Sequence, residues 1–164
     1  MTAPFSTSTT TPSLVRSRLA DLGIDLPTAV APNYTYEPVT VWGDIAFVSG
    51  QIPRRDGGVV RGTLGVDRDL EEAQGAAALC VLGALAQLEA AVGLDRVAQV
   101  LKLTVYVASA PDVVTQPLAA EGASRTLVDA FGERGRHSRT ALGVPRLPAD
   151  ALLEIDLVVG LHRA

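Results

Sequence analysis

The sequence predicts an α+β domain in which two helices cover one face of a mixed β-sheet. Two observations carry this prediction: short apolar or alternating runs near both ends of the chain, and two long segments of helical periodicity between them. The elements follow in the order ββαβαββ, which favours a sheet that buries one face under its helices. At 164 residues, 48% of them hydrophobic, the chain has material for one core and one domain.

The N-terminal part of the chain lies outside the predicted sheet. Residues 1–13 are rich in Ser, Thr and Pro and lack an apolar stretch, so we expect a disordered tail and not a signal peptide. Residues 14–22 predict a short helix that ends at Gly23. Residues 14–164 are expected to form a single domain, with this helix as an N-terminal extension.

The first strands form a predicted hairpin. Two apolar runs, Val39–Trp42 and Ile45–Ser49, are separated by the turn residues Gly43-Asp44. A later strand, 97–108, alternates in character, and its expected core-facing residues are Leu101, Leu103, Val105 and Val107.

Two helices are predicted from apolar spacing. The first begins after a cap at Asp67 or Asp69, shows apolar residues at steps of three and four, and ends at Gly93. The second begins after 109, is broken or kinked at Pro117, and ends before Gly132.

Side-chain alternation in the last two strands predicts which residues share a face. In 138–144 the larger apolar residues are Leu142 and Val144, so Arg139, Ala141 and Gly143 are expected to point away from the core. In 151–160 the apolar residues are odd-numbered, so Glu154, Asp156 and Val158 point away as well. If a turn at 145–150 makes the two strands antiparallel neighbours, Arg139 lies opposite Asp156, with Glu154 on the diagonal.

The predicted uncovered face is too apolar for a solvated surface and too charged for a dry core. It combines the residues just named with Lys102, Thr104 and Tyr106 of the preceding strand. A second copy of the chain is the simplest cover, which predicts a closed homo-oligomer with pockets between its subunits.

Composition excludes several classes of function. A net charge of −4 argues against non-specific nucleic-acid binding, which needs clustered Lys and Arg. A lone Cys80 cannot form an intrachain disulfide, so we expect a cytoplasmic protein and assign Cys80 to a helix core. No apolar run predicts a membrane span. Acidic residues near 67–72 have no His or Cys nearby, so no metal site is expected.

Several runs resemble the RidA/YjgF (Rid) family, which has a chorismate-mutase-like fold. They occur in the family's order from Ala31 to the C-terminus: Pro32-Asn33-Tyr34, Phe47-Val48-Ser49-Gly50-Gln51-Ile52-Pro53, Leu101–Val107, and the stretch from Arg139 through Leu147-Pro148 to Glu154-Ile155. A divergent branch with Gly-x-His-x-Arg, here Gly135-Arg136-His137-Ser138-Arg139, is the nearest match.

The resemblance implies a homotrimer with sites between subunits and hydrolysis of imines or enamines from amino acids to 2-keto acids and ammonia. Arg139 matches the arginine that holds the substrate carboxylate, and a planar guanidinium suits that task. Glu154 matches the acidic residue that orients water or relays its proton. Tyr34, Ser49 and Gly50 match residues lining the site. No cofactor is implied, because an imine carbon is already electrophilic.

The chain departs from the family around the arginine. Most members carry Pro-Ala-Arg-Ser where this chain has His137-Ser138-Arg139-Thr140, and a cysteine where it has Ala141. An asparagine common in the second helix has no counterpart in Glu121-Gly122-Ala123-Ser124. These departures leave the carboxylate anchor and change its surroundings.

Alternatives therefore stay open at this stage. Arg139 could form a structural ion pair, Glu154 could be solvated, and His137 could be a hydrogen-bonding residue or an acid or base. The enzyme hypothesis is a small imine or enamine deaminase, a hydrolase. A non-catalytic binder of small anionic metabolites is its main alternative, and an endoribonuclease is a third, with no pair of histidines or His–Lys pair to support it.

Overall fold

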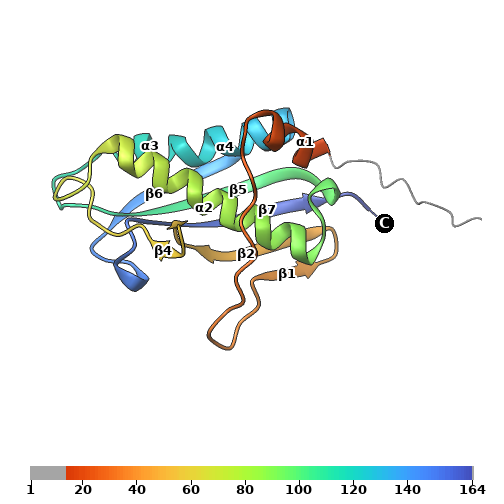
Figure 1. Ribbon diagram of the computed structural model, residues 1–164, viewed down its shortest axis with the longest axis horizontal. Coiled ribbons are helices and arrows are strands. Elements are labelled where there is room, and N and C mark those ends of the chain that lie inside the picture. The colour runs from red at the N-terminus through yellow and green to blue at the C-terminus, as the bar shows by residue number, and fades with distance from the viewer. Residues whose placement is uncertain (1–13, 164) are drawn as a thin grey trace, which may run out of the picture.

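A five-stranded sheet with helices on one face forms the protein, for which a computed structural model describes residues 14–163 (Figure 1). The expected tail at 1–13 lies outside the described residues. The sheet strands are β1 (Val39–Trp42), β2 (Ile45–Gln51), β5 (Val97–Ala108), β6 (Ser138–Val144) and β7 (Leu153–Leu161). The helices are α1 (Leu14–Asp21), α2 (Leu70–Ala91), α3 (Gln116–Ala119) and α4 (Glu121–Phe131), and β3 (Arg54–Arg55) and β4 (Gly58–Val59) form a separate small hairpin.

The predicted fold class and element order are confirmed, with α3 as an addition. The second helical region starts later than predicted, because Pro117 stands in the first turn of α3, where a missing N–H costs nothing. Pro117 therefore begins a helix and does not break one. Helix α1 buries Val15 and Leu19 in the core beside α4.

Helix α2 is the central element of the helical layer. Asp69 accepts a hydrogen bond from the Glu72 backbone, and the Glu72 side chain accepts one from the Asp69 backbone, a capping box that starts the helix. By length and hydropathy α2 could cross a membrane, but more than half of it is buried against the sheet and α4, as in a core helix. Its Cys80 is fully buried.

The last two strands are not neighbours, which corrects the expectation from sequence. The strand order is β1-β2-β7-β5-β6, so β5 lies between β7 and β6, and β6 runs parallel to β5 at the edge of the sheet. The α3–α4 region connects β5 to β6 as a crossover, and such connections join parallel strands. Arg139 therefore pairs in register with the buried Leu103 and not with Asp156.

The facing of β6 is also opposite to the prediction. Leu142 is 38% exposed, whereas Ala141 packs against the core. A Cβ on Gly143 would lie 2.7 Å from the Gln116 side chain of α3 and from Ser109. At Gly143 the contact with α3 leaves no room for a larger residue, so Gly143 and Ala141 stand on the helix-covered side. Arg139 precedes Ala141 by two residues in the same alternation and shares that side, where it reaches α3 and α4.

The other strands follow the predicted alternation closely. Leu153, Ile155, Leu157 and Val159 are all buried in β7. In β5 only Leu101 departs, since the register shifts between Val100 and Lys102 and leaves Leu101 39% exposed. The uncovered face thus keeps Lys102, Thr104, Tyr106, Glu154, Asp156 and Val158 and gains Thr140 and Leu142 in place of the three β6 residues above.

Substituting Gly122 tests the close packing of α4 on α2. A Cβ at Gly122 would lie 1.9 Å from the Gln74 carbonyl oxygen, so Gly122→Ala should lower the free energy of unfolding by about 1–3 kcal/mol. Gly75, in α2, has nothing within 4 Å of a built Cβ, so Gly75→Ala should raise it by about 1 kcal/mol through helix propensity. Urea unfolding measures both, and equal effects would contradict the packing argument.

Candidate functional site

The Gly135-x-His137-x-Arg139 motif forms a site where the edge strand meets α4. A Cβ on Gly135 would lie 2.2 Å from the Leu127 carbonyl oxygen, so the chain passes α4 at a distance that only glycine allows. The next residues then run beside α4 into β6. This close approach places His137 and Arg139 next to the side chains of the first turns of α4.

Arg139 makes three hydrogen bonds on the helix-covered side. Its Nη1 donates to Glu121 Oε1 at 2.6 Å and to Ser124 Oγ at 2.8 Å, and its Nη2 donates to the Pro117 carbonyl at 3.2 Å. The ion pair with Glu121 is partly buried, with the arginine side chain 24% exposed. Arg139 thus forms a structural ion pair. Its partner is Glu121 of α4 and not Asp156, the residue that the sequence placed opposite it.

His137 continues this chain of hydrogen bonds. Its Nε2 lies 3.1 Å from Ser124 Oγ, and its Nδ1 lies 2.6 Å from the Gly135 carbonyl oxygen. A carbonyl can only accept, so we assign the proton to Nδ1. In the neutral ring Nε2 then accepts from the Ser124 hydroxyl, and the serine oxygen accepts from Arg139.

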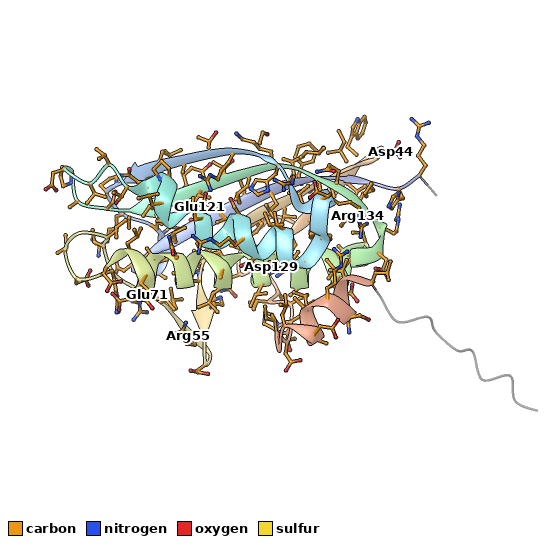
Figure 2. All side chains as sticks on the ribbon, turned by 90° about the horizontal axis from the view of Figure 1, so that it is seen from above. Asp44, Arg55, Glu71, Glu121, Asp129 and Arg134 are labelled. Atoms are coloured by element: carbon orange, nitrogen blue, oxygen red, sulfur yellow. The ribbon has the colours of Figure 1, made fainter. Side chains whose placement is uncertain are left out.

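These side chains line a cavity of about 570 Å³, named here the α4–β6 pocket. Its wall also includes Arg125, Arg136 and Asp129, so three arginines face two carboxylates, those of Glu121 and Asp129. Figure 2 shows Glu121 and Asp129 near the two ends of α4, with Arg134 beyond its end. A pocket of this size and charge suits a small anionic molecule.

Glu154 lies elsewhere, on the uncovered face of the sheet. It is half-buried, and this burial raises its pKa above the ordinary glutamate value, with the nearby charge of Asp156 adding to the effect. Asp156 in turn accepts a hydrogen bond from the Tyr106 hydroxyl at 3.1 Å, and burial together with Asp156 raises the pKa of Tyr106. This face therefore carries a small acidic cluster.

One other predicted site residue, Gly50, adjoins Glu154, and Ser49 precedes it in β2. A Cβ on Gly50 would lie 1.9 Å from Glu154 Oε1, so Gly50 leaves the space that the carboxylate occupies. Ser49 precedes it at a register shift of β2, and its hydroxyl donates to the Glu37 carbonyl at 2.7 Å. Tyr34 lies in the loop before β1 with 82% of its surface exposed.

Arg139 and Glu154 consequently lie on opposite faces of one sheet, which corrects the single face predicted from sequence. Gly50 and Glu154 form one group, and Arg139 with His137 forms another. Sequence reasoning missed Glu121 and Ser124, which complete the second group. Their spacing of three residues puts both on one face of α4. Among residues 14–163, no three His, Cys, Asp or Glu side chains converge as metal ligands.

Comparisons with known proteins agree with this fold. Residues 16–161 match the family model "YjgF/chorismate_mutase-like, putative endoribonuclease". The chain belongs to the YjgF/chorismate-mutase-like family. It is 44% identical to Protein TCP17 of Trypanosoma cruzi over 151 residues, which cover 90% of this chain and 94% of that protein.

Two crystal structures resemble the chain over nearly its whole length. Atu1372 from Agrobacterium tumefaciens, described as of unknown function, is 41% identical with a TM-score of 0.85, covering 90% of this chain and 92% of that one. A "putative endoribonuclease" from Shewanella oneidensis MR-1 is 36% identical with a TM-score of 0.87, covering 90% and 99%. The family and the fold are thereby shown.

The pH dependence of stability tests the environment of Glu154. Because its pKa is raised, the folded protein keeps this proton at pH values where the unfolded chain has lost it, so stability falls as pH rises through the raised pKa. Glu154→Gln should therefore gain stability relative to wild type at about pH 8 and little at about pH 4. Urea unfolding at both pH values measures the difference.

A matched control is Glu133→Gln, since the Glu133 side chain is 84% exposed. No comparable pH-dependent gain is expected there. A Glu154→Gln effect that is the same at both pH values would show that Glu154 has no such perturbed titration.

Proposed function

We propose that this protein hydrolyses small imines or enamines derived from amino acids, releasing a 2-keto acid and ammonia. The observation that carries the proposal is the set of hydrogen bonds that Arg139 makes in the α4–β6 pocket. A guanidinium has five N–H donors, and three are used within residues 14–163, which leaves two for a ligand carboxylate. The resemblance to the Rid family, in which Arg139 matches the arginine that holds the substrate carboxylate, supports the same proposal.

The substrate carboxylate and Glu121 would share Arg139, each on different N–H donors. Glu121 already holds the guanidinium by a charge-assisted bond of 2.6 Å, so it fixes the orientation of the planar group before a ligand arrives. The two remaining donors then define where a second carboxylate binds. This arrangement favours a small 2-imino or 2-keto acid, whose reacting carbon is directly bonded to its carboxylate.

A second copy of the chain supplies the other half of the proposed site. Arg139 and Glu154 lie on opposite faces of one sheet, so a single subunit cannot bring both to one substrate. The uncovered face exposes several large apolar side chains, namely Trp42, Ile45, Phe47 and Leu142. Both outer strands, β1 and β6, have an open edge, and a closed trimer would cover these edges and this face together.

The reaction requires the protein to position the substrate and to transfer protons. Water adds to the electrophilic imine carbon, its two protons pass in turn to the nitrogen, and the C–N bond then breaks to leave the keto oxygen on carbon and release ammonia. Glu154 of a neighbouring copy can take the proton from water and return it to nitrogen, and burial raises its pKa toward the pH range where such exchange is useful. No cofactor takes part in these steps.

Charge on the uncovered face should disrupt the proposed trimer. Phe47 is 47% exposed on β2, so Phe47→Glu would place a carboxylate inside the subunit interface and should convert trimer to monomer. Val66→Glu, at a 73% exposed loop position before α2, is the control and should stay trimeric. Sedimentation equilibrium measures the mass. A wild-type monomer, or a Phe47→Glu trimer, would contradict the proposed assembly.

The activity is tested with 2-iminobutyrate generated in situ and 2-ketobutyrate as a binding probe. Arg139→Ala should lower kcat/KM by about 100-fold or more, as expected when one partner of a hydrogen-bonded charge pair is removed. Glu121→Gln should tighten 2-ketobutyrate binding, because it removes a negative charge beside the ligand carboxylate while its amide oxygen can still accept from Arg139. Arg16→Gln, which removes an exposed salt bridge of α1, should leave both unchanged.

The outcomes separate the proposed function from its alternatives. Binding of 2-ketobutyrate that depends on Arg139, without acceleration of imine hydrolysis, would make the protein a binder of small carboxylates. Cleavage of an RNA substrate by the purified protein, lost in His137→Ala, would favour the endoribonuclease named in the family description. The absence of both turnover and binding would overturn the proposal.

A further inference from the structure

A serine and a histidine are hydrogen-bonded inside the α4–β6 pocket, and imine hydrolysis does not require them. Ser124 comes from the second turn of α4 and His137 from the segment before β6, yet Ser124 Oγ and His137 Nε2 are 3.1 Å apart. A hydroxyl within hydrogen-bond distance of a histidine nitrogen is the arrangement by which enzymes activate a serine nucleophile. Both side chains line the cavity and are only partly buried.

The histidine is held in the tautomer that this chemistry needs. Nδ1–H donates to the Gly135 carbonyl oxygen at 2.6 Å, so Nε2 is free to accept the serine proton. Gly135 is itself held against the Leu127 backbone by a contact that no Cβ would permit. The Gly135 carbonyl thus orients the His137 ring, as a carboxylate does in a catalytic triad.

A positive charge stands on the other side of the serine oxygen. Arg139 Nη1 donates to Ser124 Oγ at 2.8 Å, and a neighbouring cation favours the ionised form of an oxygen acid. Glu121 shares the same guanidinium and offsets part of this effect. Arg125 adds positive charge to the pocket wall, whereas Arg136 is paired with Glu133 at 2.9 Å and Asp129 lines the same wall. An acyl group with a negative charge at its far end fits this wall better than a neutral one.

We propose that Ser124 is a nucleophile with His137 as its general base, and that the α4–β6 pocket hydrolyses small esters whose acyl part carries a carboxylate. Ser124 Oγ bonds to the ester carbonyl carbon while its proton passes to His137 Nε2. The C–O bond of the ester then breaks, and the alcohol leaves with the proton from His137. Water, deprotonated by His137, attacks the acyl-serine and releases the free acid and the serine hydroxyl.

The test uses mono-(4-nitrophenyl) succinate, an activated ester with a free carboxylate, and its neutral analogue 4-nitrophenyl acetate. The wild-type protein should release 4-nitrophenol in a burst equal to its site concentration, and mass spectrometry of peptides should place the acyl group on Ser124. The succinate ester should react faster than the acetate. Ser124→Ala should abolish the burst, and His137→Gln should slow it by about 10²- to 10⁴-fold.

Ser138→Ala is the matched control. Ser138 stands between His137 and Arg139, but its hydroxyl donates to the Leu101 carbonyl and lies outside the serine–histidine pair. This variant should keep the full burst. Thermal unfolding of each variant shows whether the fold is retained, and Ser124→Cys, which keeps a nucleophile of similar size, should still be acylated at position 124 if Ser124→Ala fails to fold.

Acylation spread over surface lysines, or a burst that survives Ser124→Ala or is unchanged in His137→Gln, would overturn the proposal. In that case the Ser124–His137 bond is a structural link between α4 and β6. The assay needs no imine turnover, so it can succeed or fail independently of the function proposed above.

Discussion

Close packing of α4 against its neighbours is the constraint on which the rest of the structure depends. Gly122 lies against the Gln74 backbone of α2, and Gly135 lies against the Leu127 backbone of α4 itself, both at distances that exclude a Cβ. The first contact sets the position of α4 over the sheet. The second brings the chain that leads into β6 alongside α4. Between these contacts, Glu121 and Ser124 meet His137 and Arg139, so the pocket is a consequence of backbone packing.

The main cation of this pocket, Arg139, has a partner within the chain and can still bind an anion. Arg139 is paired with Glu121, which removes the cost of a partly buried cation without a partner. Its two remaining N–H donors are the feature of the pocket that attracts an anion, together with the nearby Arg125, since Arg136 is paired with Glu133. A ligand carboxylate therefore meets an oriented guanidinium rather than a flexible one, which lowers the entropy cost of binding.

The uncovered face of the sheet presents a second, different chemistry. Glu154 and Asp156 are close enough to raise the pKa of Glu154 beyond the effect of burial alone, and Tyr106 donates to Asp156. Exposed aromatic and aliphatic side chains, Phe47 among them, surround this acidic cluster. Such a face fits a subunit interface, and the separation of Glu154 from Arg139 explains why the site proposed for imine hydrolysis needs more than one copy.

The sequence by itself determined the elements and most of their facing. The hairpin at β1 and β2, the capped start of α2 at Asp69, and the buried odd-numbered residues of β7 depend on local spacing, turn residues and alternation, which are properties of neighbouring residues. The family also followed from runs of adjacent residues, with the Ser49-Gly50 and Arg139-to-Glu154 stretches most informative.

Only the tertiary structure decided the strand order and the direction in which Arg139 points. Larger apolar residues usually mark the core face, but on β6 the helices approach so closely that Ala141 and Gly143 fill that side, and Leu142 points to the open face. The strand–helix–strand order of β5, α4 and β6 was the signal for a parallel edge strand. The pairing of Arg139 with Glu121, 18 residues earlier, depends on how two elements pack, and no local pattern encodes that distance.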